Sequence, residues 1–215
     1  MKLKILLGGF LDLRFLEDPV RLIMSVLALL WALTFHEFCH GLAAYLCGDS
    51  TAKRSGRLSL NPLAHLDLVG TLMLLIFHFG WAKPVEINSM YFKNPRRDLI
   101  IVSLAGVVGN FLTAFLAVLF FRYCSSWWWN LTGKTGIIFL QEMTAINLGL
   151  AAFNLIPIPP LDGSRVLEAL LPYEYLYIYE WLERYGLIII FALVFTGAIN
   201  IFFDPIINFL LKLLP

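Results

Sequence analysis

The sequence contains few charged residues. Only 14% of its 215 residues are Asp, Glu, Lys or Arg, and 60% are hydrophobic. A soluble globular protein carries about 25% charged residues. The mean hydropathy of the chain is +0.78. This composition leaves too little polar surface to cover a globule in water, so it predicts a protein whose solvent is the lipid bilayer.

Excess charge of one sign, cysteine pairs and internal repeats are also lacking. The net charge of +1 gives no reason to expect a nucleic-acid partner. Three cysteines, Cys39, Cys47 and Cys124, form no CxxC pair and leave one thiol over, which argues against a disulfide framework. We therefore expect one integral-membrane domain over residues 1–215, with its core between residues 19 and 171.

Long apolar runs set the expected topology. A membrane-spanning helix needs about 20 apolar residues, and runs of about 10–14 are more often re-entrant or interfacial. Runs of spanning length cover residues 19–47, 98–121, 136–156 and 186–203, and Asp204-Pro205 separates the last run from an apolar tail. The run 68–79 is shorter and is expected to dip into the membrane and return. The predicted fold is an all-α polytopic membrane protein with about four to six transmembrane helices and a re-entrant or short extended segment around residues 49–95.

Three ionisable residues interrupt the first apolar run, in the sequence "HEFCH" at residues 36–40. This HExxH pattern on a helix places His36 and His40 one turn apart on the same face, where both imidazoles can bind one Zn²⁺. Glu37 then lies beside the metal and can act as general base toward a water molecule. Satisfied core histidines are the plainer alternative, but ionisable residues at membrane depth are rare and usually functional. The motif therefore predicts a zinc site.

A catalytic zinc needs a third protein ligand. The candidates near apolar stretches are His65, Asp67, His78, Asp98 and Asp162. If residues 68–79 dip and return, the next two spans bring Asp162 back to the face that carries the histidine pair. A full crossing by residues 68–79 would put Asp162 on the opposite side. The shortness of that run favours Asp162, whereas its alternative role is to cap the helix that follows.

Basic residues indicate which side of the membrane faces the cytosol. In the predicted topology more Lys and Arg residues fall on the zinc side (Lys53, Arg54, Arg57, Lys83, Lys93, Arg96, Arg97, Arg165 and Arg184) than on the other side (Lys2, Lys4, Arg14, Arg21, Arg122 and Lys134). Loops rich in these residues stay cytoplasmic. We therefore expect the zinc site to face the cytoplasmic half of the membrane.

Together with "NLIPIPPLDG" at residues 154–163, the HExxH motif makes the chain resemble the site-2 protease family of intramembrane zinc metalloproteases, in the short prokaryotic form without PDZ or CBS domains. The resemblance runs from about residue 31 to residue 170. It implies His36, His40 and Asp162 as zinc ligands and Glu37 as general base. It also suggests that Asn110 and Asn154 contact the substrate, although ordinary interhelical hydrogen bonding is the alternative for both.

The implied activity is hydrolysis of peptide bonds within or near transmembrane segments of other membrane proteins. The expected partners are a transmembrane protein or peptide, the lipid bilayer of a prokaryotic cell membrane and a regulatory membrane protein. Two alternatives remain at this point. Another membrane HExxH metalloprotease, of the prenyl-peptide-processing type, would lack the Asp162 ligand. A non-enzymatic metal-binding scaffold or transporter would bind the ion without cleaving anything, and a transporter would be expected to show related halves.

Overall fold

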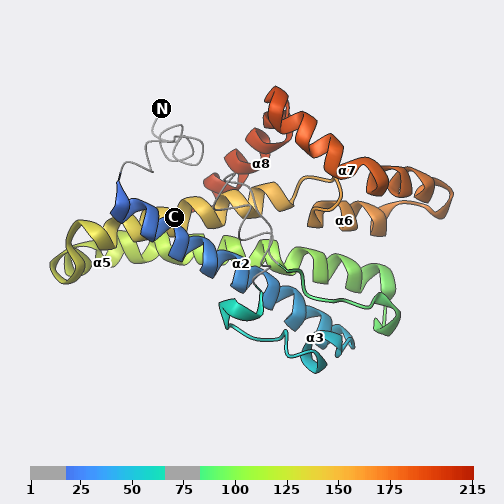
Figure 1. The fold of residues 1–215 in the computed structure, drawn as a ribbon, viewed down its shortest axis with the longest axis horizontal. Helices are drawn as coiled ribbons and strands as arrows, with labels where there is room; N and C mark the ends of the chain where they lie inside the picture. The colour runs from blue at the N-terminus through green and yellow to red at the C-terminus, as the bar shows by residue number, and fades with distance from the viewer. Residues whose placement is uncertain (1–17, 66–82) are drawn as a thin grey trace.

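The computed structural model describes residues 18–65 and 83–215, and every regular element in these residues is helical. In chain order the elements are α2 (Pro19–Cys47), α3 (Thr51–Arg54), η2 (Pro62–Ala64), η3 (Ser89–Tyr91), α5 (Pro95–Asn154), α6 (Asp162–Leu170), η4 (Tyr173–Tyr175), α7 (Leu176–Thr196) and α8 (Asn200–Lys212). Figure 1 shows the long helices lying side by side along one axis. The predicted all-α class is confirmed for these residues.

Helix α2 has the bounds of the expected span 19–47, and residues at both ends account for them. The Asp18 carboxylate accepts hydrogen bonds from the backbone N–H groups of Val20 and Arg21, and Pro19 occupies the first turn. At the other end Gly48 adopts φ +113°, a left-handed conformation that glycine takes without the steric cost of a Cβ. The expected span 19–47 is therefore the observed helix.

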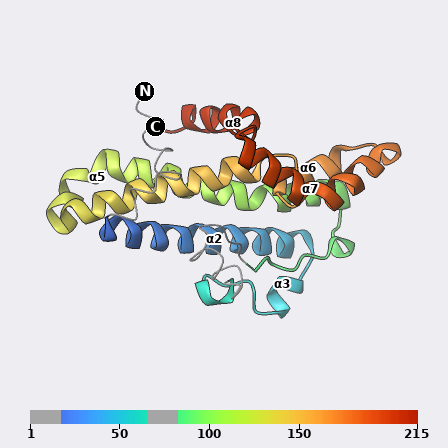
Figure 2. The same ribbon diagram turned by 45° about the horizontal axis from the view of Figure 1, so that its top comes forward.

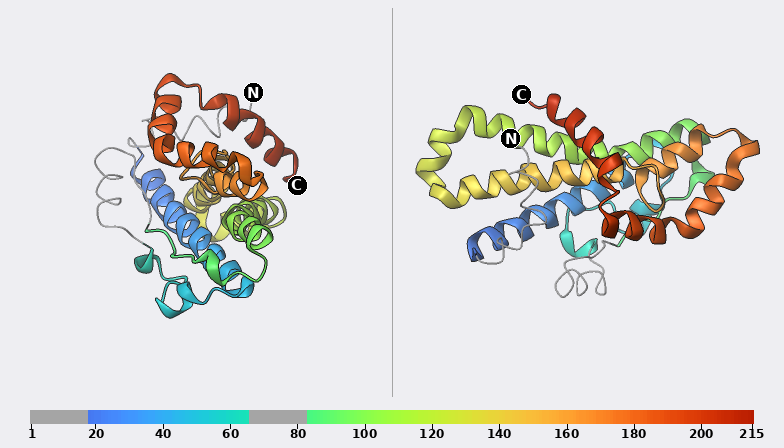
Figure 3. Two further views of the ribbon diagram at one scale, coloured as in Figure 1. Left: turned by 90° about the vertical axis from the view of Figure 1, so that its right-hand side faces the viewer. Right: turned by 90° about the horizontal axis from the view of Figure 1, so that it is seen from above.

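Helix α5 is a hairpin of two antiparallel arms. It is helical from Pro95 to Asn154 except at Gly133, whose φ of +61° and ψ of −148° reverse the chain (Figure 1). The predicted spans 98–121 and 136–156 are thus arms of one folded-back helix, and the tryptophans at 127–129 continue the first arm. Figures 2 and 3 show α2 on one side of this hairpin, with α7 and α8 on the other.

The last predicted span is wrong in its boundaries. Helix α7 ends at Thr196, where Gly197 adopts φ +74°, and α8 continues at an angle of 83°. Asp204 and Pro205, the expected interruption, lie inside α8. The break falls at Gly197 because glycine can adopt the left-handed conformation, whereas Pro205 removes only one hydrogen-bond donor from the helix.

Helices α2 and α5 are long and apolar enough to cross a membrane, and the bent α7–α8 pair counts as a further candidate span. The described residues therefore contain two candidate spans, or three with the bent pair, and one of them, α5, is folded back into two arms. The expected run 68–79 lies outside the described residues. The chain nevertheless leaves α2 and enters α5 at the same end of the bundle, since Lys93 N–H donates to Cys47 O at 3.3 Å. The prediction that residues 68–79 dip into the membrane and return requires α2 to end and α5 to begin on the same side.

Small residues bring these helices together. Ala28 and Ala32 of α2 pack against Ile146 in the second arm of α5, and Ala43 and Ala44 pack against Val102 in the first arm. Alanine lets helix backbones approach closely where lipid offers no hydrophobic driving force. The first arm of α5 therefore lies directly over the face of α2 that carries the HExxH histidines.

Candidate metal centre

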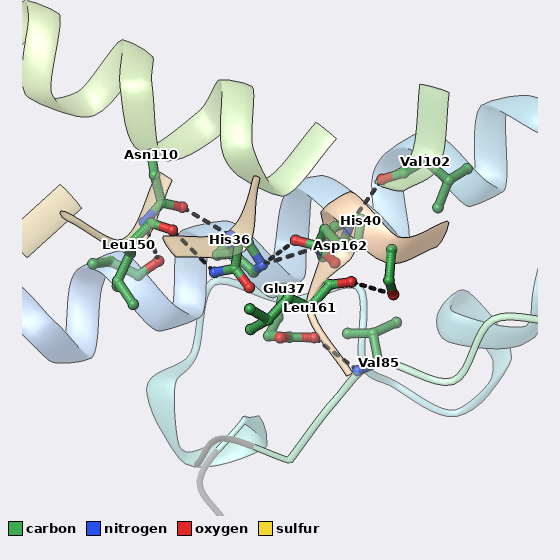
Figure 4. Close-up of polar contacts among 12 residues, drawn as sticks. His36, Glu37, His40, Val85, Val102, Asn110, Leu150, Leu161 and Asp162 are labelled. Atoms are coloured by element: carbon green, nitrogen blue, oxygen red, sulfur yellow. Dashed lines mark hydrogen bonds and ion pairs between the residues drawn. The ribbon is translucent and has the colours of Figure 1, made fainter. Parts of the chain in front are cut away.

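Helix α2 presents His36 and His40 on one buried face, with 6% and 5% of their surfaces exposed. Their Nε2 atoms lie 3.0 Å apart, as the one-turn spacing predicts (Figure 4).

The other nitrogen of each ring is bound by the first arm of α5. His36 Nδ1 lies 3.0 Å from Asn110 Oδ1, and His40 Nδ1 lies 2.7 Å from Val102 O. Asn110 is fully buried and its Nδ2 donates to Ala32 O, so its oxygen faces the imidazole. Because both partners of the histidines are oxygen acceptors, each Nδ1 must carry the hydrogen. Both Nε2 atoms are then left with lone pairs directed at the same point.

Asp162 supplies a third lone pair to this point. Its Oδ2 lies 3.1 Å from His36 Nε2 and 3.2 Å from His40 Nε2, and it has no other hydrogen-bond partner in the described part of the chain. Asp162 is the first residue of α6, where it makes no capping hydrogen bond among the described contacts. The structure therefore brings Asp162 to the histidine pair, as the predicted topology requires.

Two glycines outside α2 hold the loop that delivers Asp162. A Cβ at Gly163 would lie 2.3 Å from Leu155 O, and a Cβ at Gly186 of α7 would lie 2.1 Å from Pro159 O. The loop between α5 and α6 is thus packed directly against both neighbouring helices, with Ile156, Ile158 and Leu161 buried beside Ile190 of α7. Backbone contact at glycine fixes the loop, and hence the carboxylate, without long side chains.

The donor set fits a zinc ion. His36, His40 and Asp162 form the one group of three or more potential ligand residues in the described part of the chain. Three lone pairs 3.0–3.2 Å apart repel one another unless a proton or a metal cation lies between them. Ligands about 2.0–2.1 Å from a tetrahedral Zn²⁺ are about 3.3 Å apart, and two imidazoles with one carboxylate are a known catalytic set. The arrangement leaves one coordination position for water or substrate.

Glu37 lies next to this group, one residue after His36. Its Oε2 accepts a hydrogen bond of 2.8 Å from the backbone N–H of Val85 (Figure 4). The sequence motif predicted the position of Glu37 beside the histidines. It gave no indication of the Val85 contact, because a backbone amide 48 residues away leaves no local signal.

The other candidate ligands have different roles. His65 is 2% exposed and its Nε2 lies 2.8 Å from Ser59 O, within its own loop, as expected for a turn residue. Asp98 is fully buried at the start of α5, where it accepts hydrogen bonds from Asn94 N–H and the Arg97 guanidinium. Asp67 and His78 lie outside the described residues.

Both asparagines that were predicted to contact substrate already form hydrogen bonds within the protein. Asn110 Oδ1 and Nδ2 are both hydrogen bonded within the protein, to His36 and Ala32. Asn154 Nδ2 donates to Leu150 O, one turn earlier in α5. In this structure Asn110 therefore orients a ring of the metal centre.

Replacing Asn110 by Ala should weaken zinc binding about 10–100-fold, because the hydrogen-bond partner that orients a ligating histidine typically contributes that much affinity. Competition against a fluorescent chelator measures the affinity. Asn147→Ala is the matched control, since Asn147 is equally buried in the other arm of α5 and donates to Met143 O. Equal zinc affinity in Asn110→Ala and wild type would contradict this role for Asn110.

The geometry agrees with comparisons to known proteins. Residues 130–196 match the family described as Peptidase family M50. "Putative zinc metalloprotease YwhC" of Bacillus subtilis (strain 168) is 38% identical over 199 residues, covering 91% of each chain. "Putative zinc metalloprotease Rip2" of Mycolicibacterium smegmatis is 32% identical over 191 residues, covering 84% of this chain and 70% of the relative. No solved structure matches the chain.

The match to the family covers the segment that delivers Asp162, and the alignments to the relatives extend over most of the chain. Membership excludes the prenyl-peptide-processing alternative, which would lack the Asp162 ligand. The chain belongs to peptidase family M50, the site-2 protease family that its two motifs resemble.

Proposed function

We propose that this chain is an intramembrane zinc endopeptidase that hydrolyses peptide bonds within or near transmembrane segments of other membrane proteins. One observation carries the proposal. His36 Nε2, His40 Nε2 and Asp162 Oδ2 converge beside Glu37, and the histidines and Glu37 belong to a helix long enough to cross a membrane.

His36, His40 and Asp162 would hold the zinc ion. When bound, it supplies Lewis acidity that polarises the scissile carbonyl and lowers the pKa of water. Glu37 accepts a proton from the attacking water and passes it to the nitrogen of the leaving amine. Asn110 and Val102 keep the two imidazoles in the tautomer that presents Nε2 to the metal.

The substrate helix must unwind before it can be cleaved, because its carbonyls are occupied by bonds to residues four positions later. An unwound segment in lipid needs new backbone partners. Residues 83–88 form no helix and contact Glu37 through the Val85 N–H, and an unwound substrate can add to such a segment as a strand. Asn154 would offer its amide oxygen to the backbone of the same unwound substrate segment.

We place the protein in a prokaryotic cell membrane, with the zinc site toward the cytosol. His40 lies about 11 Å from the C-terminal end of α2, at 1.5 Å per residue. At this end Lys53, Arg54, Lys93 and Arg96 are exposed, as expected for cytoplasmic loops. The partners are lipid, a transmembrane substrate and a membrane protein that regulates access.

Metal removal tests the proposal. The purified chain in lipid nanodiscs should contain about one zinc per chain by elemental analysis, as one such site predicts. It should cleave members of a panel of fluorogenic single-span peptides with a helix-breaking pair at mid-span. A chelator should abolish cleavage and added zinc should restore it. Cleavage that persists without metal, or failure to cleave any peptide of the panel, would overturn the proposal.

A further inference from the structure

The catalytic carboxylate of the proposed enzyme is held by a backbone amide. Val85 N–H donates to Glu37 Oε2 at 2.8 Å, and the described residues offer Glu37 no other hydrogen bond. Val85 is 7% exposed, so water competes little for its amide. With Oε2 occupied, Oε1 is the oxygen left to exchange protons. Figure 4 shows the Val85 segment crossing below the metal centre on the side of Glu37.

Residues 83–93, which we call the strap, contain no α-helix and are tied down on both sides of Val85. Lys83 N–H donates to His65 O at 2.8 Å on one side. On the other side Asn88 N–H donates to Asp49 Oδ2 at 2.7 Å, and Lys93 N–H donates to Cys47 O at 3.3 Å. The strap is therefore fixed to α2 and its C-terminal extension, the same element that carries Glu37.

Asp49 is the side chain that anchors the strap, at Asn88, three residues after Val85. It is fully buried just after α2, and its Oδ1 accepts from Thr51 N–H at 2.9 Å and from Thr51 Oγ1 at 2.5 Å. Its Oδ2 is left for Asn88 N–H. Burial alone would raise the pKa of Asp49, but the hydrogen bonds from Thr51 and Asn88 outweigh it and lower the pKa. Asp49 is thus a carboxylate at neutral pH, and both its oxygens are used.

We propose that Asp49 is a positioning residue for the general base. By accepting the Asn88 N–H, Asp49 holds the strap in the position from which the Val85 N–H reaches Glu37. This inference rests on the proposed function and adds a residue outside both sequence motifs. Glutamate has three rotatable side-chain bonds, and a misplacement of about 1 Å at a reacting group can cost about 100-fold in rate. The strap removes that freedom without contributing a side chain to the reaction.

Asp49→Asn tests the anchor. An amide can accept on one side only, so its NH₂ group must face either Asn88 N–H or the Thr51 donors. We expect kcat to fall about 10–100-fold, as for other misplaced reacting groups. Zinc content should stay at the wild-type level, because the metal ligands are untouched. kcat should fall by a larger factor than KM rises, because the misplaced general base acts in the chemical step.

Asp18→Asn is the matched control. Asp18 also accepts backbone N–H groups at an end of α2, but at the end remote from Glu37. It should leave kcat unchanged while lowering thermal stability comparably. Wild-type kcat in Asp49→Asn would overturn the inference. So would equal kcat losses in Asp49→Asn and Asp18→Asn, which would indicate a general effect of stability.

An ester at residue 85 tests the contact directly, and it decides the question if Asp49→Asn does not fold. Cell-free translation can replace Val85 by its α-hydroxy analogue, which exchanges the N–H group for an oxygen that cannot donate a hydrogen bond. The same exchange at Ile87, whose N–H has no hydrogen bond within the described chain, is the control. We expect lower kcat with full zinc content at residue 85 alone. If both esters match the wild type, the inference fails while the proposed function stands; the proposed function fails only if the wild type itself does not cleave.

Discussion

Glu37→Gln should strongly slow peptide cleavage while leaving about one zinc per chain, as the untouched ligand set predicts. Glutamine has the shape of glutamate and can still accept the Val85 N–H on its amide oxygen, but it cannot take a proton from water. A positioned general base contributes about 10²–10⁴-fold to rate, so we expect a loss in that range. Single-turnover assays with the fluorogenic peptides, together with elemental analysis of the same samples, measure both quantities.

Glu142→Gln is the control for neutralising a buried acid in a membrane helix. Glu142 is 8% exposed in the second arm of α5 and accepts hydrogen bonds from Arg21 and Ser25, near the opposite end of α2 from Gly48. It should keep wild-type cleavage, since it contacts no metal ligand. If Glu37→Gln cleaved as fast as the wild type, Glu37 would not be the base. If Glu37→Gln lost its zinc as well, the result would favour a structural role.

The same experiment separates an enzyme from a protein that only binds or transports the ion. A transporter whose histidines and acids coordinate its cargo would lose transport when a ligand is removed, but it would cleave no peptide in any form. Loss of cleavage with retention of metal is the signature of a base that acts beside the ion. Family membership already favours the enzyme, and this measurement would test the activity itself.

Features set by neighbouring residues could be predicted from the sequence. The bounds of α2 match the apolar run 19–47, and in the structure Asp18, Pro19 and Gly48 each act on them within one turn. The His36–His40 pair follows from helix geometry alone, since residues four apart share a face. Local chemistry decides these features, so the prediction and the structure agree on them.

Contacts between distant segments could be predicted only partly. Asp162 was placed beside the histidines by counting crossings, an argument that depended on the length of one apolar run. The Nδ1 partners of the histidines and the amide of Val85 depend on how α5 and the strap dock on α2, which periodicity does not encode. The reversal between residues 121 and 136 was predicted without its position at Gly133, and the break at Gly197 was expected at Asp204-Pro205. An isolated glycine in an apolar run does not say which conformation it will adopt.

Gly106→Ala should eliminate high-affinity zinc binding. An added Cβ would lie 2.5 Å from His40 Nε2, 2.6 Å from His36 Cε1 and 2.7 Å from His36 Nδ1. Both rings are pinned to the same arm of α5, through Asn110 and Val102, so they cannot move away without breaking those bonds. We expect zinc affinity to fall by more than about 100-fold, beyond the loss of one orienting hydrogen bond, and cleavage to fall with it.

Two other glycines of α5 separate this effect from ordinary packing. A Cβ at Gly149 would meet nothing within 4 Å, so Gly149→Ala should keep zinc and gain up to about 1 kcal/mol of stability from helix propensity. A Cβ at Gly109 would lie 2.6 Å from Cys39 Sγ, the end of a side chain, and would strain that contact without touching either imidazole. Gly109→Ala should therefore lose about 1–3 kcal/mol of stability, as overpacked sites do, and still bind zinc. If Gly106→Ala retained zinc as well as Gly109→Ala does, the close approach of α5 would serve helix packing alone and the metal centre would not depend on it.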